Sequence, residues 1–191
     1  MKFWQLNADR IGLRLTLCAA LVAVSGQTSA TAEPPQPKIE LKVASWAKTL
    51  AEIKTFKGKV VVVDMWSTSC IPCMREFPNL VKLQTKHGKR IVCVSFNCDY
   101  LGIAGKPPES YRGRALKFLK KQRAALVNIL SSTPSDELFD QMDLGSIPAI
   151  YVFDPSGRLV QRFDNDDRDS GDEFTYKDHV VPLVEKLLTK K

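Results

Sequence analysis

The sequence predicts an α/β fold in which helices flank a mixed central sheet, and three features carry that prediction. The continuous apolar run Val60–Trp66 (VVVVDMW) has the length and β-branched content of a buried central strand. A second such run, Arg90–Phe96, follows after a segment with helical periodicity. Near the C-terminus, Ala149–Phe153 and Leu159–Phe163 flank an Asp-Pro-Ser-Gly turn, which predicts a hairpin.

The first part of the chain supplies three further elements. Lys38–Val43 alternates polar and apolar residues, as an edge strand does. Ser45–Phe56 carries apolar residues at helical spacing and predicts a short amphipathic helix. Pro72–His87 predicts a long helix, because a proline stands in its first turn, where the missing N–H has no intrahelical partner anyway.

The second part continues the alternation of helices and strands. Asn97–Ser110 is a polar loop rich in glycine and proline, and Tyr111–Arg123 is a helix. Leu126–Leu130 is a short strand, and Ser135–Met142 is a helix that begins behind a Ser/Pro cap. Tyr176–Thr189 has an apolar stripe and forms the C-terminal helix.

Composition restricts the class of protein. The 191 residues are 44% apolar and 26% charged, which is typical of a soluble globular protein. The net charge is +7, but the basic residues form no patch interleaved with aromatic residues, so no nucleic-acid partner is expected. The basic run Lys117–Arg123 fits the solvated side of a helix, with an anion-binding face as the alternative.

Residues 1–32 have the pattern of a signal peptide. A basic region is followed by the apolar run Leu15–Val24 and by Ala30-Thr31-Ala32, a cleavage-site sequence. The apolar run has ten residues, too few to cross a bilayer of about 30 Å as a helix. We expect a periplasmic or secreted protein with a leader at 33–43 and one domain at 44–191. An uncleaved N-terminal membrane anchor is the alternative.

The candidate reactive site is Cys70-Ile71-Pro72-Cys73, which follows the central strand and opens a helix. A thiolate is the attacking species in disulfide exchange, and the N-terminus of a helix favours an anion. Cys70 is therefore the expected nucleophile, and Cys73 can resolve the mixed disulfide. A permanent structural bridge and half of a zinc site are the alternatives, although zinc needs four ligands and the chain has no second CxxC.

The segment VVVVDMWSTSCIPCMREFPNL resembles the active-site region of thioredoxin-like proteins, especially the TlpA/ResA-like group of exported thiol–disulfide oxidoreductases. The resemblance extends over about residues 44–189. It rests on separated positions: Asp64, Trp66, Pro72, the Glu76-Phe77-Pro78 sequence and Ile147-Pro148. It implies a thioredoxin-like fold with an inserted segment, about 98–130, before a cis-proline loop.

The resemblance also implies roles for individual residues. Asp64 would be a buried acid with a raised pKa that exchanges a proton with Cys73, an Asp that caps a turn being the alternative. Ile147 and Pro148 would bind the substrate backbone through a cis peptide bond, with a trans loop proline as the alternative. Trp66 would contribute to substrate binding or pack in the core. Ser69 stands where most relatives have tryptophan, which thins the apolar rim.

Dithiol–disulfide exchange on exported proteins is the expected function, with reduction the expected direction. The partners would be protein thiols and disulfides and a membrane or periplasmic electron donor; neither a cofactor nor a metal is expected. One alternative is a copper-binding assembly chaperone that uses Cys70, Cys73 and Met74. Another is a thiol peroxidase, although the usual signature of that class is absent.

Two more groups of residues have open roles. Cys93 and Cys98 are five positions apart on and after a strand, so their side chains should point to opposite faces. We expect two ordinary thiols that alkylation labels without prior reduction; a second disulfide and a relay to the active site are the alternatives. The acidic stretch Asp164–Glu173 predicts a solvated loop, with calcium binding as the alternative, because its spacing does not match a calcium loop.

Overall fold

The computed structural model describes residues 38–164 and 174–189. The expected signal peptide at 1–32, the start of the leader and nearly all of the acidic stretch lie outside the described residues. Within the two described ranges, no helix combines the length and the apolar character that crossing a bilayer requires.

The strands of the described residues form one mixed sheet in the order β1-β4-β3-β2-β5-β6. Their bounds are β1 Lys42–Ala44, β2 Val60–Trp66, β3 Ile91–Asn97, β4 Val127–Ser131, β5 Ala149–Phe153 and β6 Leu159–Phe163. The first four strands of that order are parallel to one another, whereas β5 is antiparallel to both β2 and β6. Every residue of β2 is buried, as expected of a central strand covered on both faces.

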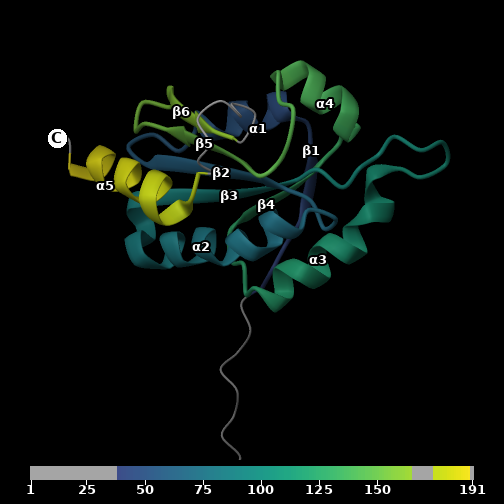
Figure 1. The fold of residues 1–191 in the computed structure, drawn as a ribbon, viewed down its shortest axis with the longest axis horizontal. Helices are drawn as coiled ribbons and strands as arrows, with labels where there is room; N and C mark the ends of the chain where they lie inside the picture. Colours follow the sequence, from purple (N-terminus) through teal and green to yellow (C-terminus); the bar gives the residue numbers. More distant parts are fainter. Residues whose placement is uncertain (1–37, 165–173, 190–191) are drawn as a thin grey trace, which may run out of the picture. The chain divides into compact units, whose positions relative to one another are not determined.

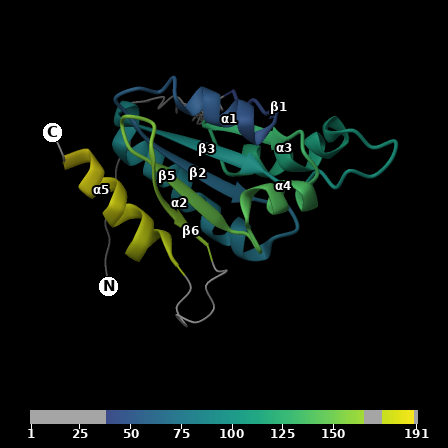
Figure 2. The same cartoon turned by 90° about the horizontal axis from the view of Figure 1, so that it is seen from above.

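Helices cover both faces of this sheet, as Figures 1 and 2 show. On one face lie α2 (Ile71–His87), α3 (Arg112–Lys121) and α5 (Val181–Thr189), the last preceded by a π-helical turn at Tyr176–Val180. On the other face lie α1 (Trp46–Ile53) and α4 (Ser135–Met142). The chain is thus a three-layer α/β fold, as the sequence predicts.

The two-residue period of β2 decides which side chains meet which layer. Val62 and Trp66 belong to the core cluster beneath α2, α3 and α5. Val63 and Met65 belong to the opposite cluster beneath α1 and α4. Asp64 therefore projects from the middle of the sheet toward the layer that contains α2 and α5.

Two boundary expectations need correction. The edge strand expected at Lys38–Val43 is shorter and begins at Lys42, which pairs with Ile129 of β4. The fold also begins before residue 44, because Leu41 is 1% exposed and belongs to the core. The segment expected as an insertion, about 98–130, contributes α3 and nearly all of β4, and β4 lies between β1 and β3 in the sheet.

Candidate active site

Cys70 and Cys73 form a disulfide at the start of α2, with their Cα atoms 5.3 Å apart. Cys70 is half-buried and is the N-cap residue of the helix, whereas Cys73 is 1% exposed. A solvent-borne reactant therefore reaches the sulfur of Cys70 first. The difference in exposure is what a nucleophile followed by a resolving cysteine requires.

The first turn of α2 provides a favourable setting for a thiolate on Cys70. The backbone N–H of Cys73 donates to the Cys70 Sγ over 3.2 Å, so the sulfur occupies the acceptor position of an N-cap. Pro72 stands within this turn, where its lack of an N–H leaves no helical hydrogen bond unmade. The positive end of the helix dipole adds to the attraction for an anion.

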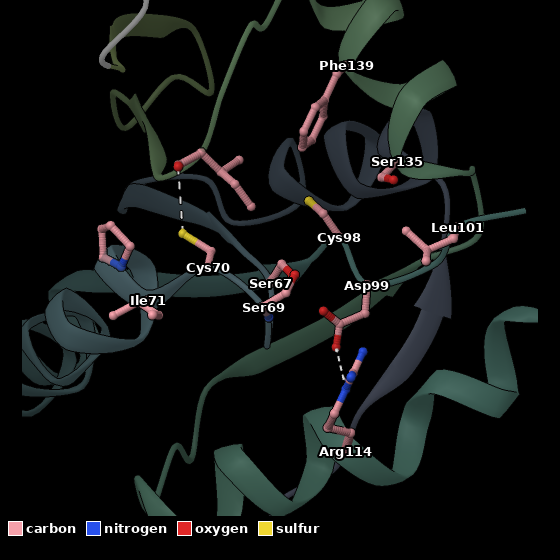
Figure 3. Close-up of a pocket in the computed structure, with 12 residues that line it drawn as sticks. Ser67, Ser69, Cys70, Ile71, Cys98, Asp99, Leu101, Arg114, Ser135 and Phe139 are labelled. Carbon is pink, nitrogen blue, oxygen red and sulfur yellow. Dashed lines mark hydrogen bonds and ion pairs between the residues drawn. The ribbon is translucent and has the colours of Figure 1, made fainter.

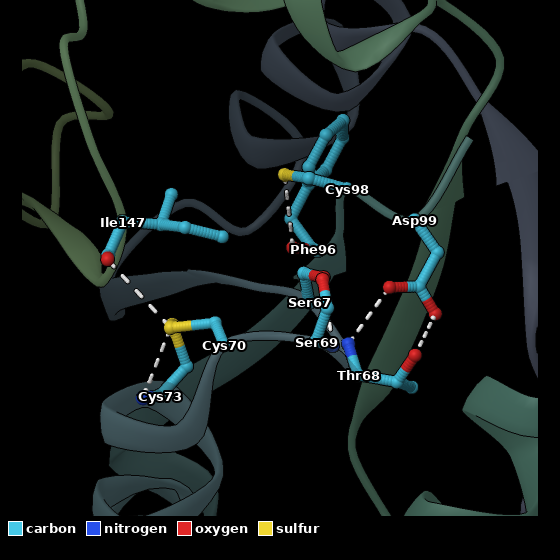
Figure 4. The surroundings of a disulfide bond; sticks show 9 residues. All are labelled: Ser67, Thr68, Ser69, Cys70, Cys73, Phe96, Cys98, Asp99 and Ile147. Atoms are coloured by element: carbon cyan, nitrogen blue, oxygen red, sulfur yellow. Dashed lines mark hydrogen bonds between the residues drawn. A yellow bond between two sulfur atoms is a disulfide. The ribbon is translucent and has the colours of Figure 1, made fainter. Parts of the chain in front are cut away.

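The loop before β5 faces this sulfur. The Ile147–Pro148 peptide bond is cis, in agreement with the expectation from the resemblance. The Ile147 carbonyl oxygen lies 3.6 Å from the Cys70 Sγ (Figure 4), so in the dithiol form the thiol of Cys70 can donate to it. Ile147 is half-buried and Pro148 is buried, so Ile147 is the residue of this pair within reach of a substrate.

The loop that leads into Cys70 is held by a buried carboxylate. The backbone N–H of Thr68 donates to Asp99 Oδ1 over 2.7 Å, and its hydroxyl donates to Asp99 Oδ2 over 2.8 Å (Figure 4). The backbone N–H of Cys70 donates in turn to the Ser67 carbonyl over 3.2 Å. Asp99, just beyond β3, thereby fixes the backbone two residues before the nucleophile. Sequence reasoning missed this residue, because an acid in a polar loop gives no local signal of its distant partner.

Asp64 is 2% exposed and its one hydrogen bond among the described residues comes from Tyr176. The Tyr176 hydroxyl donates to Asp64 Oδ2 over 2.6 Å, and Oδ1 has no partner there. Burial raises the pKa of Asp64 to about 7; the hydrogen bond from Tyr176 opposes that rise and the negative charge of Glu76 adds to it. The alternative of a turn cap is wrong, since Asp64 lies inside β2.

Trp66 packs in the core, which is the second of the two roles considered for it. Its side chain is 0% exposed, and its indole N–H donates to the Ser95 hydroxyl over 2.7 Å. The ring packs against Phe77 and Phe118, with centroids 5.1 and 4.8 Å away. Trp66 faces the α2 side of β2, where Phe77 of α2 and Phe118 of α3 cover it.

A cleft of about 740 Å³ opens beside Cys70 (Figure 3). Its apolar lining includes Ile71, Leu101, Phe139 and Ile147, of which Ile71 and Leu101 are 71% and 54% exposed. Ile71 is a neighbour of Ser69 in the sequence, whereas Leu101, Phe139 and Ile147 come from segments further along the chain. The contribution of these three residues to the apolar rim could not be located from the sequence.

Cys93 and Cys98 are separate buried thiols on opposite faces of the sheet, as the spacing predicts. Burial raises the pKa of both thiols, which keeps them protonated. The two free thiols confirm the expectation that they form no disulfide. We expect alkylation of the folded protein to be slow, since a reagent needs both access and a thiolate. Cys98 nonetheless lines the cleft beside Cys70. In the described residues, no group of three or more His, Cys, Asp or Glu side chains is arranged to hold a metal ion.

A half-buried cysteine at a helix N-terminus, a buried partner three residues on and a facing cis-proline loop define a thioredoxin-fold thiol–disulfide oxidoreductase. The family model "Redoxin" matches residues 31–179, and the chain belongs to the redoxin family.

Two relatives match this chain along most of their own length and most of its length. Thiol-disulfide oxidoreductase ResA of Bacillus subtilis is 24% identical over 162 residues, which cover 80% of this chain and 81% of ResA. Thiol:disulfide interchange protein HelX of Rhodobacter capsulatus is 25% identical over 159 residues, which cover 83% and 72%. The similarity to ResA and HelX agrees with the resemblance of the active-site segment to the TlpA/ResA-like group.

Solved structures share the fold. The lipoprotein thioredoxin Etrx1 of Streptococcus pneumoniae has a TM-score of 0.51 and 21% identity, over 71% of this chain and 90% of that one. A thioredoxin-family thiol:disulfide interchange protein of Chlorobium tepidum has a TM-score of 0.51 and 19% identity, over 70% and 83%.

Proposed function

We propose that this oxidoreductase reduces disulfides of exported proteins, with Cys70 as nucleophile, Cys73 as resolving thiol and Asp64 as proton carrier. The observation that carries the proposal is the paired but unequal exposure of the two cysteines at the N-terminus of α2. The periplasmic or secreted location rests on the signal-peptide pattern of residues 1–32.

In the first step the Cys70 thiolate attacks one sulfur of the substrate disulfide. A Cys70–substrate disulfide forms, and the other substrate sulfur leaves as a thiolate that takes a proton from solvent. An extended substrate lies across the cis-proline loop, where the Ile147 carbonyl can accept a hydrogen bond from a substrate N–H. Pro148 is buried, so its part is to set the backbone of that loop.

In the second step Cys73 must lose its proton in a buried setting. Asp64 projects from β2 toward the layer that contains α2 and Cys73. Because the pKa of Asp64 is about 7, its ionised carboxylate can accept that proton near neutral pH. The Cys73 thiolate then attacks Cys70 Sγ, the mixed disulfide breaks, and the substrate leaves fully reduced. The enzyme now holds the Cys70–Cys73 disulfide, and a membrane or periplasmic dithiol donor must supply two electrons to reset it.

Trapping the intermediate tests these roles. The Cys73→Ser variant, reduced and mixed with a peptide disulfide, should accumulate a covalent Cys70–peptide adduct visible by mass spectrometry. Cys70→Ser is the matched control and should form no adduct at that position. If Cys73→Ser formed no adduct, or if adducts appeared on Cys73 in Cys70→Ser at the same rate, the assignment of nucleophile and resolving thiol would be refuted.

A further inference from the structure

The cleft beside Cys70 has one charged wall, made by Arg114 and Asp99 (Figure 3). Arg114 belongs to the first turn of α3, and its Nε lies 4.0 Å from Asp99 Oδ2. The Arg114 side chain is 63% exposed, whereas that of Asp99 is 1% exposed. The guanidinium is therefore the part of this pair that a substrate in the cleft can reach.

Asp99 and Arg114 differ in how many of their hydrogen-bonding groups already have a partner. Both oxygens of Asp99 already accept hydrogen bonds from Thr68. Among the described residues, Arg114 has Asp99 as its charged partner, through Nε at the limit of ion-pair distance. A guanidinium has five N–H donors in a planar fork, so its two terminal nitrogens retain the geometry that pairs with a carboxylate.

The helix that carries Arg114 adds positive charge beyond it. The sequence of α3, RGRALKFLKK, holds five basic residues and no acidic one. Arg114, Lys117 and Lys121 are all exposed and share one side of the helix, because residues three and seven apart fall on the same face. Arg114 is the residue of α3 that lines the cleft. The others supply a field that attracts negative charge toward it.

The rest of the cleft suits a polypeptide rather than an isolated ion. Ile71 and Leu101 offer exposed apolar surface next to Cys70, and Phe139 lines the same space. An extended chain that presents its cysteine to Cys70 and its backbone to Ile147 would pass between these apolar groups and Arg114.

We propose that the cleft selects polypeptide substrates with an acidic residue within a few positions of the reacting cysteine, and that Arg114 binds that carboxylate. This inference rests on the proposed function, because it concerns the substrate of the same cysteine pair. The basic helix, for which the sequence left a solvated face and an anion-binding face open, then belongs to the substrate surface. Asp99 orients Arg114 and also holds the loop before Cys70, so Arg114 is the residue to alter.

The test compares disulfide-linked peptides that differ in one side chain. One series carries Glu at each position from four residues before to four residues after the cysteine, and the matched series carries Gln. The kcat/KM of the full protein is measured for each peptide. We expect a Glu/Gln preference of about three- to ten-fold at one or two positions, in the range of a partly exposed charge-assisted contact.

Two variants locate the preference. Arg114→Gln should bring the Glu/Gln ratio to about one. Lys121→Gln makes the same change of charge about 10 Å further along α3 and should keep the preference within about two-fold. Equal loss in both variants would overturn a direct contact with Arg114. A ratio near one in the native protein, with both peptides reduced, would overturn this inference alone; failure to reduce any peptide would refute the proposed function.

Discussion

Replacement of Asp64 by Asn should change how the stability of the protein depends on pH. An unfolded Asp loses its proton near pH 3.8, whereas burial raises the pKa of Asp64 in the folded protein to about 7. Between these pH values the folded state binds one more proton than the unfolded state, so stability falls as pH rises. The pKa difference corresponds to about 4 kcal/mol, which is lost as the pH rises through 7 and is gone by about pH 8. Asp64 is fully buried, so solvent screening does not reduce this value much.

Urea unfolding of the oxidised protein at several pH values between 3 and 8 measures the effect. Other groups titrate in both proteins, so the quantity of interest is the unfolding free energy of wild type minus that of Asp64→Asn. We expect this difference to fall by about 4 kcal/mol between pH 3 and pH 8, most steeply between pH 4 and pH 7, and to be flat above about pH 8. A difference that is constant across the range, or that rises with pH, would refute the raised pKa of Asp64.

Tyr176→Phe keeps the carboxyl group of Asp64 and changes its surroundings. It removes the O–H that donates to Asp64 over 2.6 Å and that lowers the pKa of Asp64. A hydrogen bond to a charged group contributes about 1.5–3 kcal/mol, so its loss should raise the pKa of Asp64 further. The pH dependence of mixed-disulfide resolution should shift in the same direction. An unchanged profile in Tyr176→Phe would show that Tyr176 is only a packing residue.

Three further outcomes are expected. Iodoacetamide should leave Cys93 and Cys98 unmodified in the folded, oxidised protein and label both in guanidinium, as peptide mass spectrometry would reveal; rapid labelling of the folded protein would contradict their burial. Trp66→Ala should lower the urea-unfolding free energy by about 3–5 kcal/mol, and a loss below about 1 kcal/mol would contradict its place in the core. The hydrogen bond from Ser156 is the main reason that the pKa of Asp154 is lowered to about 2. Ionised Asp154 should therefore stabilise the hairpin by about 1 kcal/mol above pH 4, and progressively less as the pH falls toward 2. An Asp154→Ala variant as stable as wild type at pH 7 would refute this.

Local chemistry explains which elements the sequence predicts well. The helix Ser135–Met142 and the strands Ala149–Phe153 and Leu159–Phe163 have the expected bounds, because the proline before the helix and the turn residues between the strands are neighbours in the chain. Pro134 is the N-cap residue of that helix and makes no capping side-chain hydrogen bond. The hairpin turn closes on Asp154, which accepts hydrogen bonds from the backbone N–H groups of Ser156 and Arg158. The first strand is less predictable, because its length is set by pairing with β4, more than eighty residues away.

The same contrast between neighbouring and distant partners decides which active-site residues the sequence predicts. Cys70 and Cys73 could be identified because the motif, the preceding strand and the following helix are contiguous. Tyr176 and Asp99 could not, since each acts on a residue at least 31 positions away and sits in an unremarkable local sequence. The role of Trp66 stayed open between substrate binding and core packing for a related reason, because the aromatic rings that cover it come from α2 and α3.

An equilibrium redox titration of the Cys70–Cys73 pair tests the central claim most directly. The protein is equilibrated with defined dithiothreitol or glutathione buffers, trapped and scored by mass, with Cys70→Ser as control. We expect a single two-electron couple near the potential of thioredoxin, about −270 mV, which suits a reductant. A potential near −120 mV would reverse the proposed direction of electron flow, and a pair that does not exchange at all would contradict the assignment of a redox site.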